Sequence, residues 1–209
     1  MHFKSVRFLY CKPYGFFDYL NRMVRLLLKW YWKLSGWKIT GNFPYQHKKM
    51  VMAVAPHTSM IDVMIGFAAR NELNIRHAKF LGKKELFKGP LGWLLRKLGG
   101  TPVDRHSKHG MVDQAASLFG NNENFLLALA PEGTRTRVDT LRSGFYHIAK
   151  KAGVPILPVA LDFKNKQLVV GEAFFPGDNE EADFKKIIDF FAGYEGRHPE
   201  KDLRHLKKP

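Results

Sequence analysis

The chain of 209 residues is long enough for one domain with small additions, and its hydrophobic content of 45% excludes disorder over most of its length. The single cysteine, Cys11, excludes an intrachain disulfide. A formal net charge of +15 indicates an anionic partner, which composition alone leaves open among nucleic acid, anionic lipid and phosphorylated substrates.

The first predicted element is an amphipathic helix over Tyr14–Leu34. At 100° per residue, four basic side chains fall within an arc of roughly 80°. These are Arg22, Arg25, Lys29 and Lys33. The other side carries the apolar side chains Phe16, Leu20, Met23, Val24, Leu27, Trp30, Tyr31 and Leu34. This pattern is typical of a helix in a lipid interface. It also fits a helix packed on its own domain with solvated charges, and the two interpretations are compatible.

No stretch of the sequence approaches the ~18 consecutive apolar residues of a membrane-spanning helix. No small-residue cleavage site follows an apolar segment, so we expect no secretory signal peptide. Together with the basic amphipathic helix, these features predict a peripheral or monotopic protein on the cytoplasmic face of a membrane, with the lipid surface as a partner.

Beyond Gly36 the pattern alternates between strands and helices. The predicted strands are Met50–Ala55, Ala78–Leu81, Thr101–Val103, Phe125–Ala130, Ile156–Phe163 and Gln167–Val170. The predicted helices are Ser59–Arg70, Gly89–Leu98, His109–Phe119 and Phe145–Ala152. This alternation predicts an α/β fold with a mixed, largely parallel central sheet flanked by helices.

Three segments are expected in this chain. Residues 1–36 form a membrane-interface helical segment, residues 37–178 the α/β domain, and residues 179–209 a C-terminal helix and basic tail. The polar tail from Gly196 to Pro209 is expected to fray.

The first candidate site is a His–Asp pair, His57 and Asp62, at the end of the strand that stops at Ala55. We expect Ser59 to cap the following helix and Asp62 to lie in its first turn. Asp62 can then accept a hydrogen bond from one ring nitrogen of His57 and leave the other free to take a proton. The alternative is an aspartate that only caps a helix.

Two further blocks place an arginine beyond a strand. In Gly99–Arg105 two glycines end a helix, a very short strand follows, and an acid and a base come next. Ala130–Arg137 follows the apolar run Phe125–Leu129 and contains Glu-Gly-Thr-Arg. Arginine at a strand end can hold a phosphate with its planar fork. The alternatives are a helix C-cap followed by a surface ion pair, and a solvated loop.

These blocks, with the Val-Pro-Ile-Leu-Pro segment at Val154–Pro158, resemble the glycerolipid acyltransferase family, typified by 1-acylglycerol-3-phosphate acyltransferase. The family pattern is His-x4-Asp, then Gly-x-x-Phe-Ile-Asp-Arg, then Phe-Pro-Glu-Gly-Thr-Arg-Ser, then Val-Pro-Ile-x-Pro. All four blocks occur here in family order, over about half of the chain.

The resemblance implies a role for each site residue. His57 would be the general base and Asp62 its orienting partner. Three cations would hold the phosphate of the acceptor, and three further residues would shape the acceptor site or add a hydrogen bond. The cations are Lys83, Arg105 and Arg135, and the further residues are Glu132, Gly133 and Thr134.

The implied reaction moves a fatty acyl group from acyl-CoA or acyl carrier protein, as co-substrate, to a lysophospholipid hydroxyl. The expected acceptor is 1-acylglycerol-3-phosphate, which would give phosphatidic acid. No metal or other cofactor is implied. Pro102-Val103 and Ala130 depart from the family's Phe-Ile and Phe. These departures leave open a different hydroxylated acceptor, such as an amino-acid lipid.

Three other functions compete with this one. A nucleic-acid-binding protein would suit the charge, but the aromatic residues are not interleaved with Lys and Arg in a stacking motif, so we expect no nucleic acid. A non-catalytic lipid-binding module would not need His57. A thioester hydrolase would release free acid without an acceptor.

Overall fold

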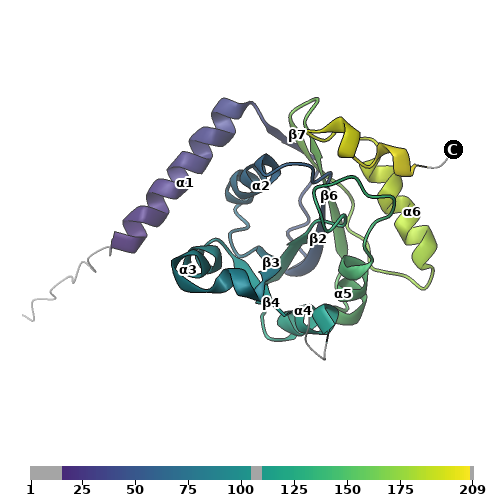
Figure 1. Ribbon diagram of the computed structural model, residues 1–209, viewed down its shortest axis with the longest axis horizontal. Coiled ribbons are helices and arrows are strands. Elements are labelled where there is room, and N and C mark those ends of the chain that lie inside the picture. Colours follow the sequence, from purple (N-terminus) through teal and green to yellow (C-terminus); the bar gives the residue numbers. More distant parts are fainter. Residues whose placement is uncertain (1–15, 105–109, 208–209) are drawn as a thin grey trace, which may run out of the picture.

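The computed structural model describes residues 16–104 and 110–207, which form a seven-stranded sheet with helices on both faces (Figure 1). The strands lie in the order β1-β7-β6-β2-β5-β3-β4. Their bounds are β1 Lys38–Thr40, β2 Lys49–Ala55, β3 Lys79–Lys83, β4 Gly100–Val103, β5 Phe125–Leu129, β6 Ile156–Asp162 and β7 Gln167–Val170. The predicted α/β fold with a mixed, largely parallel sheet is confirmed.

Strands β2 to β6 all run in one direction. β7 pairs with β6 in the antiparallel sense, and β1 pairs with β7 in parallel, so the outer pair runs the opposite way. The central strand β2 contributes to two cores. Met50 and Met52 pack on one face of the sheet, and Val51 and Ala53 pack on the other. A strand covered on both faces explains the continuous apolar run in the sequence.

The helices divide between the two faces of the sheet. Their bounds are α1 Phe16–Ser35, α2 Ile61–Glu72, α3 Gly89–Lys97, α4 Gly110–Gly120, α5 Gly144–Ala152 and α6 Glu180–Phe191, with short 3-10 turns η1 Lys84–Phe87, η2 Pro199–Lys201 and η3 Arg204–Leu206. Right-handed crossovers place α2 and α3 on one face and α4 and α5 on the other. Helix α1 packs on α2, and Figure 1 shows α1, α2 and α3 together, away from α4, α5 and α6.

Helix α1 packs on its own domain and also keeps apolar side chains exposed. Trp32 is buried in the core beneath the helix, and Leu28 and Tyr31 pack against the same core. A second apolar side remains in solvent, where Trp30 is 59% exposed and Leu34 is 77% exposed. The helix is therefore fixed to its own domain and still presents an apolar surface. No helix in the described part of the chain is long and apolar enough to cross a membrane.

The expectation that the C-terminal tail frays is wrong for residues 196–207. Leu203 has no exposed surface and belongs to the same core as β2 and α5. The Asp202 carboxylate accepts a 2.7 Å hydrogen bond from Nε of Arg204. The amide of Phe163 donates a 2.8 Å hydrogen bond to the carbonyl of Glu195, which fixes the segment to the end of β6. A single buried leucine anchors a segment whose composition is otherwise that of a tail.

We expect Leu203→Ala to lower the free energy of unfolding by about 2–5 kcal/mol, because it removes a fully buried side chain and leaves a cavity. Urea unfolding followed by circular dichroism measures this loss. The matched control is Leu34→Ala, at an exposed position, for which we expect a change within about 0.5 kcal/mol. Similar small changes in both variants would mean that the segment does not share the core.

Candidate active site

The predicted site residues that the structure describes lie at or near the edge of the sheet where the parallel strands end. His57 follows β2, Glu132 follows β5, and Lys83 is the last residue of β3. Because β5 pairs directly with β2, the segments after these two strands are neighbours. The carboxyl ends of parallel strands are where α/β sheets usually hold their ligands.

The pairing of His57 with Asp62 is present in the structure. Nδ1 of His57 lies 3.1 Å from Oδ2 of Asp62. The same oxygen accepts hydrogen bonds of 2.7 Å from the backbone amides of Thr58 and Ser59. The carboxylate is buried, whereas the imidazole is 23% exposed. When Nδ1 carries the proton and donates it to Asp62, Nε2 is the nitrogen that can accept a proton.

The helix after this turn begins two residues later than expected. α2 begins at Ile61, and Ser59 lies outside it. The Ser59 hydroxyl accepts a 2.9 Å hydrogen bond from the amide of Ile61, while Asp62 reaches back to the amide of Ser59. Ser59 therefore satisfies a backbone donor at the start of the helix, as a cap would, but the capping position itself belongs to Met60.

Glu132 joins the two neighbouring loops. Its Oε1 accepts a 2.8 Å hydrogen bond from the backbone amide of His57, and the residue is only 1% exposed. Burial raises the pKa of this carboxyl to about 7, against the opposing effects of the His57 amide bond and the His57 charge. The expected role for Glu132 was to shape the acceptor site. The hydrogen bond that Glu132 makes is with the turn that carries His57.

The rest of the Glu-Gly-Thr-Arg loop turns outward. Gly133 has a φ of +66°, and its amide donates a 3.0 Å hydrogen bond to the carbonyl of Ala130. This tight turn needs a residue that adopts positive φ, which is the role of glycine here. The hydroxyls of Thr134 and Thr136 lie 3.1 Å apart. Arg135 is exposed to solvent.

The structure does not bring all the predicted phosphate ligands together. Lys83 is exposed at the end of β3, and β5 separates that strand from β2. Two strand spacings place it roughly 10 Å sideways from the His57 turn. Arg105 lies outside the described residues. The preceding residue, Asp104, has a carboxylate oxygen 3.7 Å from Nζ of Lys84.

One set of contacts was missed by the sequence analysis. The C-terminal segment, defined here as residues 193–207, lies against the His57 turn, where the amide of His198 donates a 3.2 Å hydrogen bond to the buried hydroxyl of Thr58. A methyl group on Gly196 would come within 3.2 Å of Cβ of Pro56. Further along, Nε2 of His205 lies 2.8 Å from the carbonyl oxygen of Val138. No local pattern in the sequence indicates contacts between residues this far apart.

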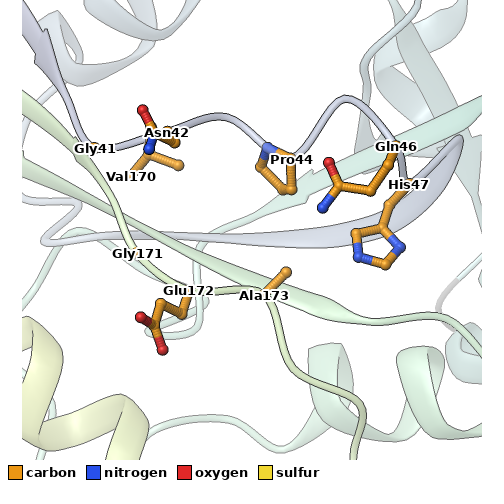
Figure 2. A pocket seen from close by; sticks show the side chains of 9 residues that line it. All are labelled: Gly41, Asn42, Pro44, Gln46, His47, Val170, Gly171, Glu172 and Ala173. Carbon is orange, nitrogen blue, oxygen red and sulfur yellow. The ribbon is translucent and has the colours of Figure 1, made fainter.

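An open hollow of about 530 Å³ lies elsewhere on the protein, and Figure 2 shows the side chains around it. Its lining comes from the β1–β2 loop and the segment after β7: Gly41, Asn42, Pro44, Gln46, His47, Val170, Gly171, Glu172 and Ala173. Gln46 and His47 lie shortly before β2, whereas Val170 pairs with Val159 of β6, which pairs with Val54 near the end of β2. None of the described site residues lines the hollow, so it is not the site of the His–Asp chemistry.

The geometry at the sheet edge defines what this site can do. A histidine has one ring nitrogen fixed by a buried carboxylate and the other uncommitted among the described residues. This is the arrangement of a general base. Within the described residues, no group of three His, Cys, Asp or Glu side chains could hold a metal ion.

We expect Glu132→Gln to flatten the pH dependence of the unfolding free energy between pH 4.5 and about 7. In this window the folded protein keeps a proton on Glu132 that the unfolded chain releases, so the wild type loses stability as the pH rises. Glutamine still offers an oxygen to the His57 amide but does not titrate. Urea unfolding of both proteins at pH 5 and pH 8 measures the difference. Equal losses between the two pH values would contradict a raised pKa at Glu132.

Comparison with known proteins agrees with the predicted resemblance. Residues 37–162 match the Acyltransferase family. A 1-acyl-sn-glycerol-3-phosphate acyltransferase of Haemophilus influenzae is 29% identical over 160 residues, covering 70% of this chain and 64% of that protein. A lyso-ornithine lipid O-acyltransferase of Pseudomonas aeruginosa is also 29% identical, over 150 residues, covering 68% of this chain and 54% of that protein. The matches thus span less than two thirds of the length of either relative.

The fold is also found in a solved structure. The crystal structure of the 1-acyl-sn-glycerophosphate acyltransferase PlsC from Thermotoga maritima superposes with a TM-score of 0.56 at 23% identity, covering 92% of this chain and 81% of that one. The family match includes His57, Asp62, Lys83 and the whole Glu-Gly-Thr-Arg loop, and it extends over more than half of the chain. On this evidence the chain belongs to the Acyltransferase family.

Proposed function

We propose that this protein transfers a fatty acyl group from acyl-CoA or acyl carrier protein to the hydroxyl of a lysophospholipid. The acceptor that we favour is 1-acylglycerol-3-phosphate, and the product is then phosphatidic acid. The observation that carries the proposal is the His57 ring, whose Nδ1 is held by a buried carboxylate while Nε2 remains available at the sheet edge. The names of the relatives support this reaction class.

The proposed step is direct transfer in a ternary complex. Nε2 of His57 takes the proton of the acceptor hydroxyl as the oxygen attacks the thioester carbonyl carbon. The C–O bond forms, the C–S bond breaks, and the leaving thiolate recovers the proton from the imidazolium. The Asp62 carboxylate stabilises that imidazolium through Nδ1. In the His57 turn the serine hydroxyl faces a helix amide, which favours transfer without an acyl-enzyme.

The buried partners of this turn serve as positioning residues. Asp62, Glu132 and Thr58 each fix one part of it by a hydrogen bond, and all three are almost fully buried. Holding a base within reach of its substrate supplies part of the rate enhancement of an enzyme, because the reacting groups no longer have to find each other.

The acceptor phosphate is assigned to Lys83, Arg105 and Arg135. Lys83 and Arg135 are exposed on the edge that carries His57, where an incoming anion can reach them. A second acceptor is supported by a specific observation, because one relative is named for lyso-ornithine lipid. That acceptor carries no phosphate, so the requirement for these cations would distinguish the two.

The place of action in this proposal is a membrane surface, as a peripheral protein on the cytoplasmic face. Helix α1 supports it with exposed basic side chains at Arg22, Arg25, Lys29 and Lys33 beside exposed apolar ones such as Leu27 and Trp30. A helix of this kind binds anionic lipid by combining apolar burial with electrostatic attraction.

An acceptor panel tests the proposed function. Full-length protein is given labelled acyl-CoA or acyl carrier protein together with 1-acylglycerol-3-phosphate, lyso-ornithine lipid or no acceptor, and the lipids are identified by mass spectrometry. We expect phosphatidic acid as the main product. Product from lyso-ornithine lipid alone would select the second acceptor. Free fatty acid without an acceptor would indicate a hydrolase, and no turnover of any thioester would indicate a non-catalytic module.

We expect His57→Ala to lower kcat by about 10²–10⁴-fold, because general-base catalysis contributes that much. The matched control is His147→Ala, an exposed histidine on α5, which should keep the wild-type rate. Steady-state rates measure both, with thermal unfolding to show that each variant is folded. An active His57→Ala variant would sink the assignment of the base. A covalent acyl-protein trapped by rapid quench and seen by intact mass would overturn direct transfer.

A further inference from the structure

Exposed apolar side chains are concentrated on one face of the sheet. Of the 15 large hydrophobic residues that are exposed among the described ones, all but Tyr45 and Phe175 belong to α1, to α2 with its preceding turn, or to η1 and α3. On η1 and α3 they are Leu86, Leu91, Trp93 and Leu94. Helices α4, α5 and α6, on the opposite face, contribute none of the 15. Contiguous exposed apolar surface on one side of a protein marks an interaction surface.

The same face is basic. The η1–α3 segment also carries the exposed cations Lys84, Lys88 and Lys97, and Glu85 is the single acidic residue between Lys83 and Lys97. Nζ of Lys84 lies 3.7 Å from the Asp104 carboxylate. The composition of α6 on the other face is different. It carries Glu180, Glu181, Asp183 and Asp189 against Lys185 and Lys186. Apolar exposure and positive charge therefore occur together on one side of the sheet.

The packing of α3 keeps its leucines outward. Gly92 faces inward, and a side chain there would collide with the backbone of Phe87. The guanidinium of Arg96 lies 5.5 Å from the centre of the Phe87 ring, which holds the helix from the same side. At 100° per residue, Leu94 lies about 200° and Leu91 about 100° around α3 from Gly92, and the two side chains are 46% and 56% exposed. The close contact at Gly92 sets which side of the helix faces Phe87.

The surface also borders the catalytic edge. Leu86 and Leu91 follow the carboxyl end of β3. Met60, which is 63% exposed, stands in the turn between His57 and α2. Apolar residues thus follow the ends of the two strands that carry His57 and Lys83, on the side of the sheet where α1 also lies.

We propose that the η1–α3 surface, defined as Leu86, Leu91 and Leu94 with Lys84, Lys88 and Lys97, docks on an anionic lipid bilayer as a second membrane contact beside α1. We favour a lipid bilayer as the partner because exposed lysines and exposed leucines occur in the same short segment. The lysines would attract anionic lipid headgroups, and the leucines would insert among the acyl chains. Contact through both α1 and α3 turns the His57 edge toward the lipid, so that an acceptor can enter from the membrane. Only this last consequence rests on the proposed function.

Vesicle binding by full-length protein tests the contact without any turnover. The probe is vesicles of phosphatidylcholine with about 30% phosphatidylglycerol, and the readout is cosedimentation. We expect Leu91→Ser with Leu94→Ser to weaken binding by about tenfold, comparable to Leu27→Ser with Leu34→Ser on α1. The matched control is Phe175→Ser, at an exposed apolar residue outside α1, α2, η1 and α3, and should change binding less than about twofold. Wild-type binding by the α3 variant would overturn the proposal.

A second measurement gives the orientation. A fluorophore is placed at Leu94→Cys, Leu27→Cys or Phe175→Cys in a Cys11→Ser background, and vesicles carry a nitroxide on their acyl chains, with no acyl donor present. We expect quenching at positions 94 and 27 and none at 175. Quenching at 27 alone would leave α1 as the membrane contact and refute the second one.

The outcome is independent of the enzyme assay. If the vesicle results are as expected but no thioester is consumed, the surface stands and the proposed reaction fails. If the α3 variant binds vesicles normally but loses acyl transfer, the reaction stands, and these leucines contact a substrate chain instead of a bilayer.

Discussion

The site depends on one buried carboxylate. A single oxygen of Asp62 receives the His57 ring nitrogen and the amides of Thr58 and Ser59. Hydrogen bonds offset the cost of burying a polar group, and all three of these donors reach Oδ2, whereas Oδ1 is buried without a hydrogen-bond partner among the described residues. The same bonds define the turn, orient the imidazole and place the charge near the first turn of α2, where the helix dipole favours it. The proposed chemistry and the local fold therefore depend on the same carboxylate.

Distant segments hold this turn from two sides. Glu132 reaches it from the loop after β5, and the amide of His198 reaches it from the C-terminal segment. Leu203 secures that segment in the core, so a stretch with the composition of a polar tail supports the sheet edge that carries His57. Glu132 with a pKa near 7 also ties the stability of the turn to protonation, because its carboxyl gains little solvation where it lies.

The two faces of the sheet differ in what they cover. Helices α4, α5 and α6 cover a core on their face of the sheet. Helices α1, α2 and α3 bury one side and leave leucines, methionines and two tryptophans exposed on the same elements as lysines and arginines. A soluble protein gains little from such a surface, but a protein working on lipids can use it to stay where its substrate is. Part of the net charge of +15 therefore lies on this face of the protein, on α1, η1 and α3.

The sequence by itself determined the alternation of strands and helices, the strand-end position of His57 and its pairing with Asp62, because those depend on periodicity and on contacts within a few residues. Only the tertiary structure decided that Glu132 turns toward the His57 amide, that Thr58 meets His198, and that the tail is anchored by Leu203. These contacts join residues separated by 75 and 140 positions, beyond the reach of any local pattern. The first follows from the pairing of β5 with β2, and the second from the packing of the C-terminal segment. The three-residue strand β1 was not predicted, and it is defined by its pairing with β7, far along the chain.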